Sequence, residues 1–278
     1  MSAKGGTYQH LMMAELKILL NSHWTLIVLT VYVLFTCGVY FSESFRQTWL
    51  QVLDGNLFTT MINLYLPTFL FIAVILNAAP IFAGDKKNGM EELADTCFYG
   101  KTFRKKAKIE ATIFYTILIT AAGFLVTAAI SLASRTPLDL ASKAFETANL
   151  DISMSNGTFY LFCFAMVVLG LVAVASAVVL ISSRSDDVIV PLATGILIYG
   201  VELALYLKPL VRILWDVNLL KLLRPYTMLS VSLYFDSTIK ALAANVIAFI
   251  LLSVALFLLT FADGSEIRAK RALSSQSS

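Results

Sequence analysis

Long runs of apolar residues, separated by short polar segments, constrain this chain more than any other feature. The run from Trp24 to Phe41 contains no charged residue, and similar runs recur along the rest of the sequence. A helix needs about 20 apolar residues, and at least about 17, to cross the hydrocarbon core of a membrane. The residues are 58% hydrophobic and 14% charged, far from the composition of an ordinary soluble domain. The sequence therefore predicts an all-α integral membrane protein.

Six transmembrane helices account for these runs within a single transmembrane domain, residues 1–278. The predicted spans are 24–41, 62–82, 111–132, 159–182, 188–206 and 239–261. Residues 8–22 predict an amphipathic helix in the membrane interface, because leucines and methionines share one face while His10, Lys17 and Asn21 share the opposite face. The alternative for this segment is an extension of the first span.

The segment 208–237 is apolar in part but too short between its breaks to span a membrane. The run 210–223 is about fourteen residues long and carries charges, and the chain is interrupted at Pro209 and at Arg224-Pro225. We expect one or two half-inserted helices that enter the outer leaflet and return, forming an outer re-entrant segment before span six.

The segment 83–110 between spans two and three carries much of the charge of the chain. It holds seven of the 21 Lys and Arg residues. With the N-terminus inside, 13 of the 21 lie in segments assigned to the cytoplasm. The positive-inside rule therefore predicts that this loop and both termini are cytoplasmic. We expect a multi-pass protein of the plasma membrane, from a bacterium.

Local signals divide this charged loop into a short helix and a basic segment. Asn88-Gly89 predicts a helix start, residues 90–96 can form about two turns, and Thr102 is a candidate N-cap for the helix of span three. The short helix has an acidic side and an apolar side, which favours docking to a partner. Residues 104–108 predict contact with lipid headgroups. The alternative is an ordinary solvated loop with headgroup anchors.

The motif DKKNGMEELADTCFYGK in this loop resembles the first cytoplasmic loop of permease subunits in the type-2 exporter family of ABC transporters. That loop typically has an acidic residue, a glycine, a Leu-containing helix, a small residue, a glycine turn and a lysine before span three. The matching positions are Asp85, Gly89, Glu92, Leu93, Thr96, Gly100 and Lys108. Lys101 departs from the family pattern, which often has arginine there. The six-span architecture with an interfacial N-terminal helix and an outer hairpin is also similar.

The resemblance implies that the short helix is a coupling helix, seated in a cytosolic ATP-binding cassette subunit. The implied contact residues are Asp85, Gly89, Met90, Glu91, Glu92, Leu93, Thr96 and Gly100. It also implies a second permease subunit, identical or different, that completes the translocation path, with ATP and Mg on the partner ATPase. The sequence contains no G-x-x-x-x-G-K-[ST] phosphate loop, so we expect no ATPase site and no catalytic residue in this chain.

Three polar residues within the predicted spans are candidates for the substrate path. They are Asn63, Asn77 and Glu202. An ionisable residue inside a membrane is a functional hypothesis by default, although Glu202 is close enough to the outer end of its span to reach headgroup water instead. The substrate class implied is a peptide, a drug or another amphipathic molecule.

Other functions are less well supported by the residues. Cys37, Cys97 and Cys163 have no metal-ligand spacing, so we expect no metal site. Paired glutamates also occur in intramembrane CAAX-type proteases, but Thr96 stands where those enzymes need arginine, and both histidines lie outside the spans. No basic tract has interleaved aromatic residues, so we expect lipid and not nucleic acid as a contact. The remaining alternative is a non-transporting membrane scaffold or sensor that anchors a cytosolic partner.

Overall fold

The structure of the chain, a computed structural model, describes residues 2–49, 57–89, 100–135, 138, 140, 154–207, 216–230 and 237–261. These residues are almost entirely helical. Five helical stretches are long and apolar enough to cross a membrane, namely His23–Phe41, Leu57–Lys87, Phe103–Ala133, Asn156–Arg184 and Thr238–Phe261. The all-helical membrane class predicted from the sequence is therefore confirmed.

The chain begins with three helices, α1 (Ser2–Leu20), α2 (His23–Phe41) and α3 (Glu43–Trp49). The next stretch, span two, consists of α4 (Leu57–Thr60), the π-helix η2 (Met61–Tyr65), α5 (Leu66–Ala78) and α6 (Pro80–Lys87). The later elements are α8 (Gly100–Ala133), α9 (Asn156–Arg184), α10 (Ile189–Leu207), α12 (Leu219–Leu223), α13 (Pro225–Ser230) and α14 (Thr238–Phe261).

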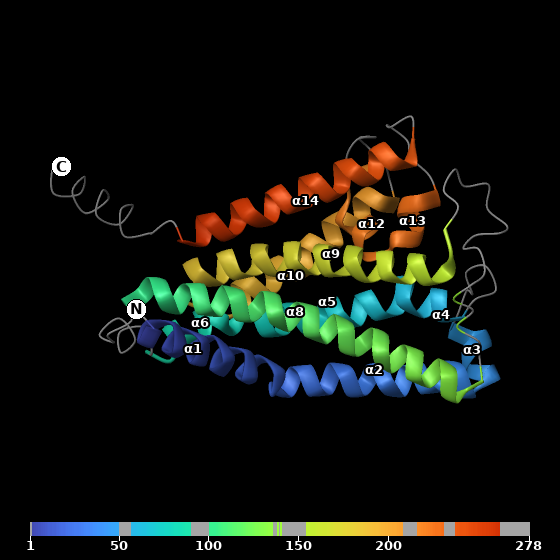
Figure 1. Cartoon of the computed structure of the whole chain (residues 1–278), viewed down its shortest axis with the longest axis horizontal. Helices are drawn as coiled ribbons and strands as arrows, with labels where there is room; N and C mark the ends of the chain where they lie inside the picture. Colours follow the sequence, from blue (N-terminus) through green and yellow to red (C-terminus); the bar gives the residue numbers. More distant parts are fainter. Residues whose placement is uncertain are drawn as a thin grey trace.

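The helices form one elongated bundle in which α9 packs against most of the other long helices (Figure 1). Its neighbours include α5, α6, α8, α10, α12 and α14. On the other side of span two, α2 packs against α5 and α8, and α1 lies along α8. Figure 1 shows α1 and α6 near one end of the bundle, the loop end, and α3, α4 and α13 near the opposite end, the hairpin end.

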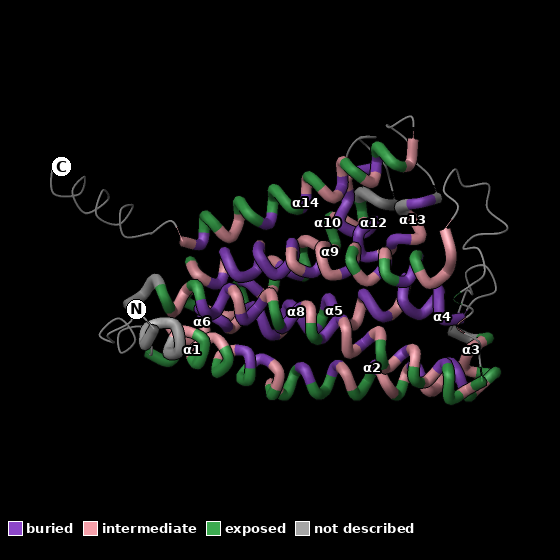
Figure 2. The backbone as a smooth tube through the Cα atoms, in the orientation of Figure 1, coloured by how far each residue is buried: buried purple, intermediate pink, exposed green. Residues whose placement is uncertain are grey.

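Burial differs strongly among the long helices. Span two and α9 are mostly buried, whereas α14 has few buried residues and many exposed ones along its length (Figure 2). Large apolar side chains are exposed on α14, α10 and α2, including Leu251, Leu258, Leu197 and Leu34. Such a surface suits a lipid environment, because lipid tails are as apolar as leucine.

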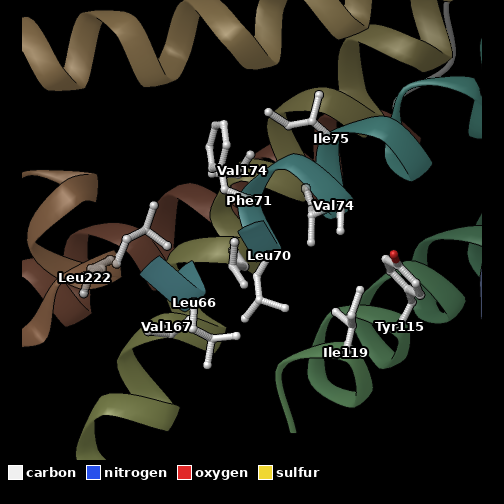
Figure 3. Close-up of a cluster of buried hydrophobic side chains, with 14 of the residues drawn as sticks. Leu66, Leu70, Phe71, Val74, Ile75, Tyr115, Ile119, Val167, Val174 and Leu222 are labelled. Carbon is white, nitrogen blue, oxygen red and sulfur yellow. The ribbon is translucent and has the colours of Figure 1, made fainter. Parts of the chain in front are cut away.

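The centre of the core is the buried face of α5 (Figure 3). Neighbouring helices contribute the side chains around it, including Tyr115 and Ile119 from α8, Val167 and Val174 from α9, and Leu222 from α12. Glycines on two neighbours permit close packing. A Cβ at Gly123 would lie 2.5 Å from Leu66, and one at Gly195 would lie 2.8 Å from Ile75.

One face of α8 is lined with buried hydroxyl groups. They belong to Thr112, Thr116, Thr120, Thr127 and Ser131. Two of the contacts between α8 and α2 are also polar, since Tyr32 OH lies 2.5 Å from Thr127 Oγ1 and Thr25 Oγ1 lies 2.9 Å from Tyr115 OH. Hydrogen bonds of this kind hold membrane helices together where apolar contacts alone have no advantage over lipid.

Pro67 explains the irregular start of span two. It has no N–H, and in a regular helix its ring would clash with the carbonyl four residues earlier, at Asn63. The π-helix η2 contains Asn63, and the N–H of Leu66 donates to the carbonyl of Met61, five residues back. The wider turn displaces the carbonyl of Asn63 and lets the helix continue past the proline.

Pro80 divides α5 from α6 in a similar way, and a side chain from α9 replaces the missing helical bonds. The hydroxyl of Ser182 donates to the carbonyl of Ala79 at 2.7 Å and accepts from the N–H groups of Phe82 and Ala83, both at 3.1 Å. A side chain inserted into the helical ladder is a recognised cause of a kink. Span two is largely buried among the other helices and not at the lipid-facing surface.

The helices reach further into the predicted loop 83–110 than expected. α6 continues to Lys87 and α8 begins at Gly100, so Thr102 lies inside α8 and is not its N-cap. Asn88-Gly89 ends α6, because Gly89 has a φ of 66° and its N–H donates to the carbonyl of Lys86, while the helix predicted over 90–96 lies outside the described residues. A left-handed glycine after the last turn is a common helix stop.

Several other boundaries agree with the sequence. Helix α10 lies at the predicted fifth span, but its apolar part, Ile189–Ala204, is shorter than the five stretches given above. α12 ends at Leu223 before α13 begins at Pro225, as the break at Arg224-Pro225 predicted. Pro209 lies outside the described residues. On α1, Leu16 and Leu19 are buried while His10 and Lys17 are exposed, as is Asn21 directly after the helix, which confirms the two predicted faces.

Candidate functional site

An ionic cluster lies at the loop end, where α6 leads into the charged loop and α8 leads out of it. The Asp85 carboxylate on α6 lies 2.7 Å from Lys108 Nζ and 2.8 Å from Arg104 Nη2, both on α8. Lys108 also donates to the carbonyl of Ile81 at 2.5 Å. Because the Lys108 side chain is 5% exposed, its charge is compensated by these partners and not by water. The two sides of the loop are thereby joined.

Helix α1 belongs to the same cluster. Glu15 lies 3.8 Å from Lys108 Nζ. Tyr8 donates to Glu110 at 2.5 Å, and Lys106 lies 3.6 Å from Glu110 with its ammonium 5.4 Å from the centre of the Tyr8 ring. Burial and the hydrogen bond to Glu110 raise the pKa of Tyr8, so its phenol remains protonated near neutral pH. Charged and polar contacts therefore fix α1 on α8.

The end of α6 also contacts the turn between α9 and α10. Lys86 Nζ donates to the carbonyl of Ser183 at 2.9 Å and lies 3.5 Å from Asp186. Lys87 lies 3.7 Å from Asp187, but the side chains of that pair are 63% and 49% exposed, so it adds little stability. Three consecutive residues at the end of α6 thus contact α8 on one side and this turn on the other.

The predicted coupling residues are only partly covered by the structure. Met90, Glu91, Glu92, Leu93 and Thr96 lie outside the described residues. Gly89 closes α6, and the backbone of Gly100 begins α8.

Asp85 is paired with two cations of α8, which changes the interpretation of residues 104–108. Contact with lipid headgroups was predicted for all of these residues, whereas Arg104 and Lys108 also pair with Asp85, and Lys108 is only 5% exposed. Both side chains point to an acidic partner inside the protein, because that partner lies on the facing helix.

A second polar cluster surrounds α12 at the hairpin end. Lys221 Nζ lies 3.0 Å from Asp216, and these side chains are 1% and 0% exposed. Asn218 caps α12 by accepting the N–H of Leu220 at 2.8 Å. Asn245 of α14 accepts the N–H of Asn218 at 3.0 Å and donates to the carbonyl of Asp216. A buried ion pair recovers its desolvation cost only when further hydrogen bonds surround it, as they do here.

Two of the three predicted path residues contact this hairpin region. Asn63 accepts the N–H of Tyr226, at the start of α13, at 2.9 Å. Glu202 accepts the N–H of Leu219, at the start of α12, at 3.2 Å. Both therefore bind the backbone of the pair of short helices α12 and α13.

The third predicted path residue lies elsewhere. Asn77 donates to Thr25 at 3.1 Å and to Tyr115 at 3.0 Å, so it joins α5 to α2 and α8. The structure brings Asn63 and Glu202 to one pair of helices and places Asn77 in a separate contact. A role of any of the three in contacting substrate stays a prediction.

Sequence reasoning missed several residues of these clusters. Asn245 is the one amide side chain in the predicted sixth span, and the rule that singled out Asn63 and Asn77 would have found it. Asp216 and Lys221 were visible as charges in an apolar run, but their pairing was not. Ser182 gave no signal, because its backbone partners lie about a hundred residues away in the sequence.

The bundle and its two polar clusters define an all-helical, multi-pass membrane protein. Within the described part of the chain, no group of three or more His, Cys, Asp or Glu side chains could hold a metal ion. Comparison of the chain with protein-family models and with curated proteins found no match. Its function must therefore be inferred from its sequence and from the geometry of its polar clusters.

Proposed function

We propose that this chain is the membrane-spanning subunit of an ATP-driven exporter. The ionic cluster at the loop end is the observation that carries the proposal. Asp85 pairs with Arg104 and Lys108, so the two helices on either side of the predicted coupling helix are joined. Lys108 reaches α1, and Lys86 reaches the turn before α10. A force applied to the loop would therefore act on several membrane helices together.

In this proposal six spans cross the plasma membrane of a bacterial cell, with α10 as the fifth. α10 has 19 residues, which is enough to cross the hydrocarbon core. The excess of Lys and Arg in the charged loop supports a cytoplasmic position for the loop end and for both termini.

The proposed partner is a cytosolic ATP-binding cassette subunit that carries ATP and Mg. Its contact would be the segment 89–96, whose acidic and apolar residues suit a docked helix. Closure of an ATPase pair would move this segment, and span two and α8 would carry the motion to a path shared with a second permease subunit. The resemblance of the loop motif supports a peptide, a drug or another amphipathic molecule as substrate.

Purification of the full chain from its native membrane in mild detergent, followed by reconstitution, tests the proposal. We expect an ATP-binding protein to co-purify and substrate to stimulate ATP hydrolysis. The variant with Glu92→Ala and Leu93→Ala should insert normally, retain ATP hydrolysis by the partner and lose export. Gln47→Ala, an exposed change on α3 at the opposite end, is the control and should leave export unchanged.

Two outcomes would contradict the proposal. Export at the normal rate in the double variant would remove the coupling assignment. An ATP-binding partner without stimulated hydrolysis or transport would favour a membrane scaffold or sensor instead.

A further inference from the structure

The starts of the two short helices α12 and α13 are held by side chains from three different long elements. Asn245 of α14 accepts the N–H of Asn218 at 3.0 Å, and Glu202 of α10 accepts the N–H of Leu219 at 3.2 Å. Asn63 of η2 accepts the N–H of Tyr226 at 2.9 Å. The first N–H groups of a helix have no partner within it, and each of these bonds supplies an acceptor to such a group.

The three attachments lie on two sides of the pair. α12 is attached to α10 and α14, while α13 is attached to span two through Asn63. α12 also lies tightly on α9, since a Cβ at Gly170 would come within 3.0 Å of Leu223. The bond from Asn63 is thus a side-chain hydrogen bond that connects this pair to the helical stretch leading to the charged loop.

The local structure of span two prepares Asn63 for this contact. Its amide nitrogen donates to the carbonyl of Thr59 at 2.9 Å, which fixes the orientation of the side chain. Its oxygen then faces two donors, the N–H of Tyr226 and the thiol of Cys163 at 3.7 Å. The whole side chain is buried, and it lies in a π-helical turn, a feature that often occurs at functional sites.

Span two connects this attachment to the opposite end of the bundle. From Asn63 the stretch runs through the buried helix α5, across the Pro80 break held by Ser182, to Asp85 in the ionic cluster. Ser182 bonds backbone groups on both sides of this break, before α6 and within it, so a shift of α6 can pass to α5, because closely packed elements tend to move as bodies.

We infer that Asn63 is a positioning residue that latches the α12–α13 pair to span two, so that the pair follows movements of the helix that begins the charged loop. The latch itself is a property of the resting chain. Its use during export rests on the proposed function.

Hydrogen–deuterium exchange on the full chain in lipid nanodiscs tests the latch. In the Asn63→Leu variant the Tyr226 N–H loses its acceptor, and we expect exchange in residues 225–230 to accelerate about tenfold, with little change at residues 218–220. Asn245→Leu should give the reverse pattern. Asn77→Leu is the matched control, because Asn77 is an equally buried amide of span two with partners on other helices.

A purely structural effect of Asn63→Leu would accelerate exchange in both segments alike, and that result would overturn the latch. Asn63→Ser, whose side chain is too short to reach Tyr226, gives the same test if the leucine variant does not fold. A Tyr226 amide that exchanges as fast as exposed turns in the unmodified chain would overturn the inference without any variant.

A comparison of exchange with and without ATP then tests the latch and the proposed function separately. In a reconstituted complex with a partner ATPase, we expect ATP to change exchange at residues 225–230 in the unmodified chain and not in Asn63→Leu. If the resting-state pattern holds but ATP has no effect on the unmodified chain, the latch stands and the exporter proposal fails. An equal response to ATP in both proteins would instead show that the pair moves independently of Asn63.

Discussion

The loop end and the hairpin end of the bundle both contain buried charge, but they compensate it differently. At the loop end, Lys108 has two carboxylate partners on two different helices, and both carboxylates remain partly exposed. At the hairpin end, Asp216 and Lys221 belong to one short segment and are almost fully buried. Amide side chains and backbone groups complete the hairpin cluster.

This difference has physical consequences for what each end can do. The partly exposed carboxylates of the loop end can change partners at low cost, because water compensates a lost contact. A fully buried pair cannot, since the loss of one partner leaves a charge in a medium of low dielectric constant. We therefore expect the buried pair at the hairpin end to contribute more to stability than the ionic cluster at the loop end.

The largest expected effect is at the buried pair. Lys221→Met leaves the Asp216 carboxylate without its ammonium partner and should lower the free energy of unfolding by about 3–5 kcal/mol. The double variant with Asp216→Leu should recover part of this loss, because neither charge is then buried. Thermal unfolding of the full chain in detergent, followed by tryptophan fluorescence, measures both. If the Lys221→Met variant were as stable as the unmodified chain, the hairpin end would not contribute more to stability than the loop end.

A smaller effect is expected at the loop end. Lys108→Met removes the partner of Asp85 and Glu15 and should cost about 1–3 kcal/mol, since Arg104 and water still compensate the carboxylates. Lys87→Met, at the neighbouring exposed pair with Asp187, is the control and should change stability by less than about 0.5 kcal/mol. Equal losses in these two variants, by the same unfolding measurement, would show that burial does not distinguish them.

The smallest effect is expected at the Pro80 break. Ser182→Ala removes the hydroxyl inserted between α5 and α6, and the N–H of Ala83 can then return to the carbonyl of Ala79, so we expect a loss of only about 1 kcal/mol. Ser183→Ala is the control, because its hydroxyl donates within α9, to the carbonyl of Leu180. Chemical unfolding compares the two variants, and a larger loss for Ser183 would contradict the assigned role of Ser182.

The sequence predicted features that depend on neighbouring residues. Apolar runs indicated the long helices, and the polar and apolar faces predicted for α1 were correct. Boundaries were less well predicted where charged residues continue a helix beyond its apolar part, as in α6 and at the start of α8. Gly89 ends α6, a role that was not predicted for it from the sequence, because the same dipeptide can precede a helix or end one.

The clusters were harder to predict, since their partners are distant in sequence. Asp85 and Lys108 are separated by the charged loop, Ser182 contacts backbone about a hundred residues away, and Asn63 contacts Tyr226 across 163 positions. Of these partners, Asn63 and Asp85 were chosen for substrate or coupling roles, and neither was expected to hold a helix in place.

Composition and periodicity by themselves determined that this chain forms apolar helices in a membrane, because the hydrophobic effect acts on each run of residues regardless of its neighbours. The tertiary structure alone decided which polar residues pair with which. A buried polar group needs a partner at hydrogen-bond distance, and the packing of the helices determines whether Lys108 meets Asp85 and whether Asn63 meets Tyr226.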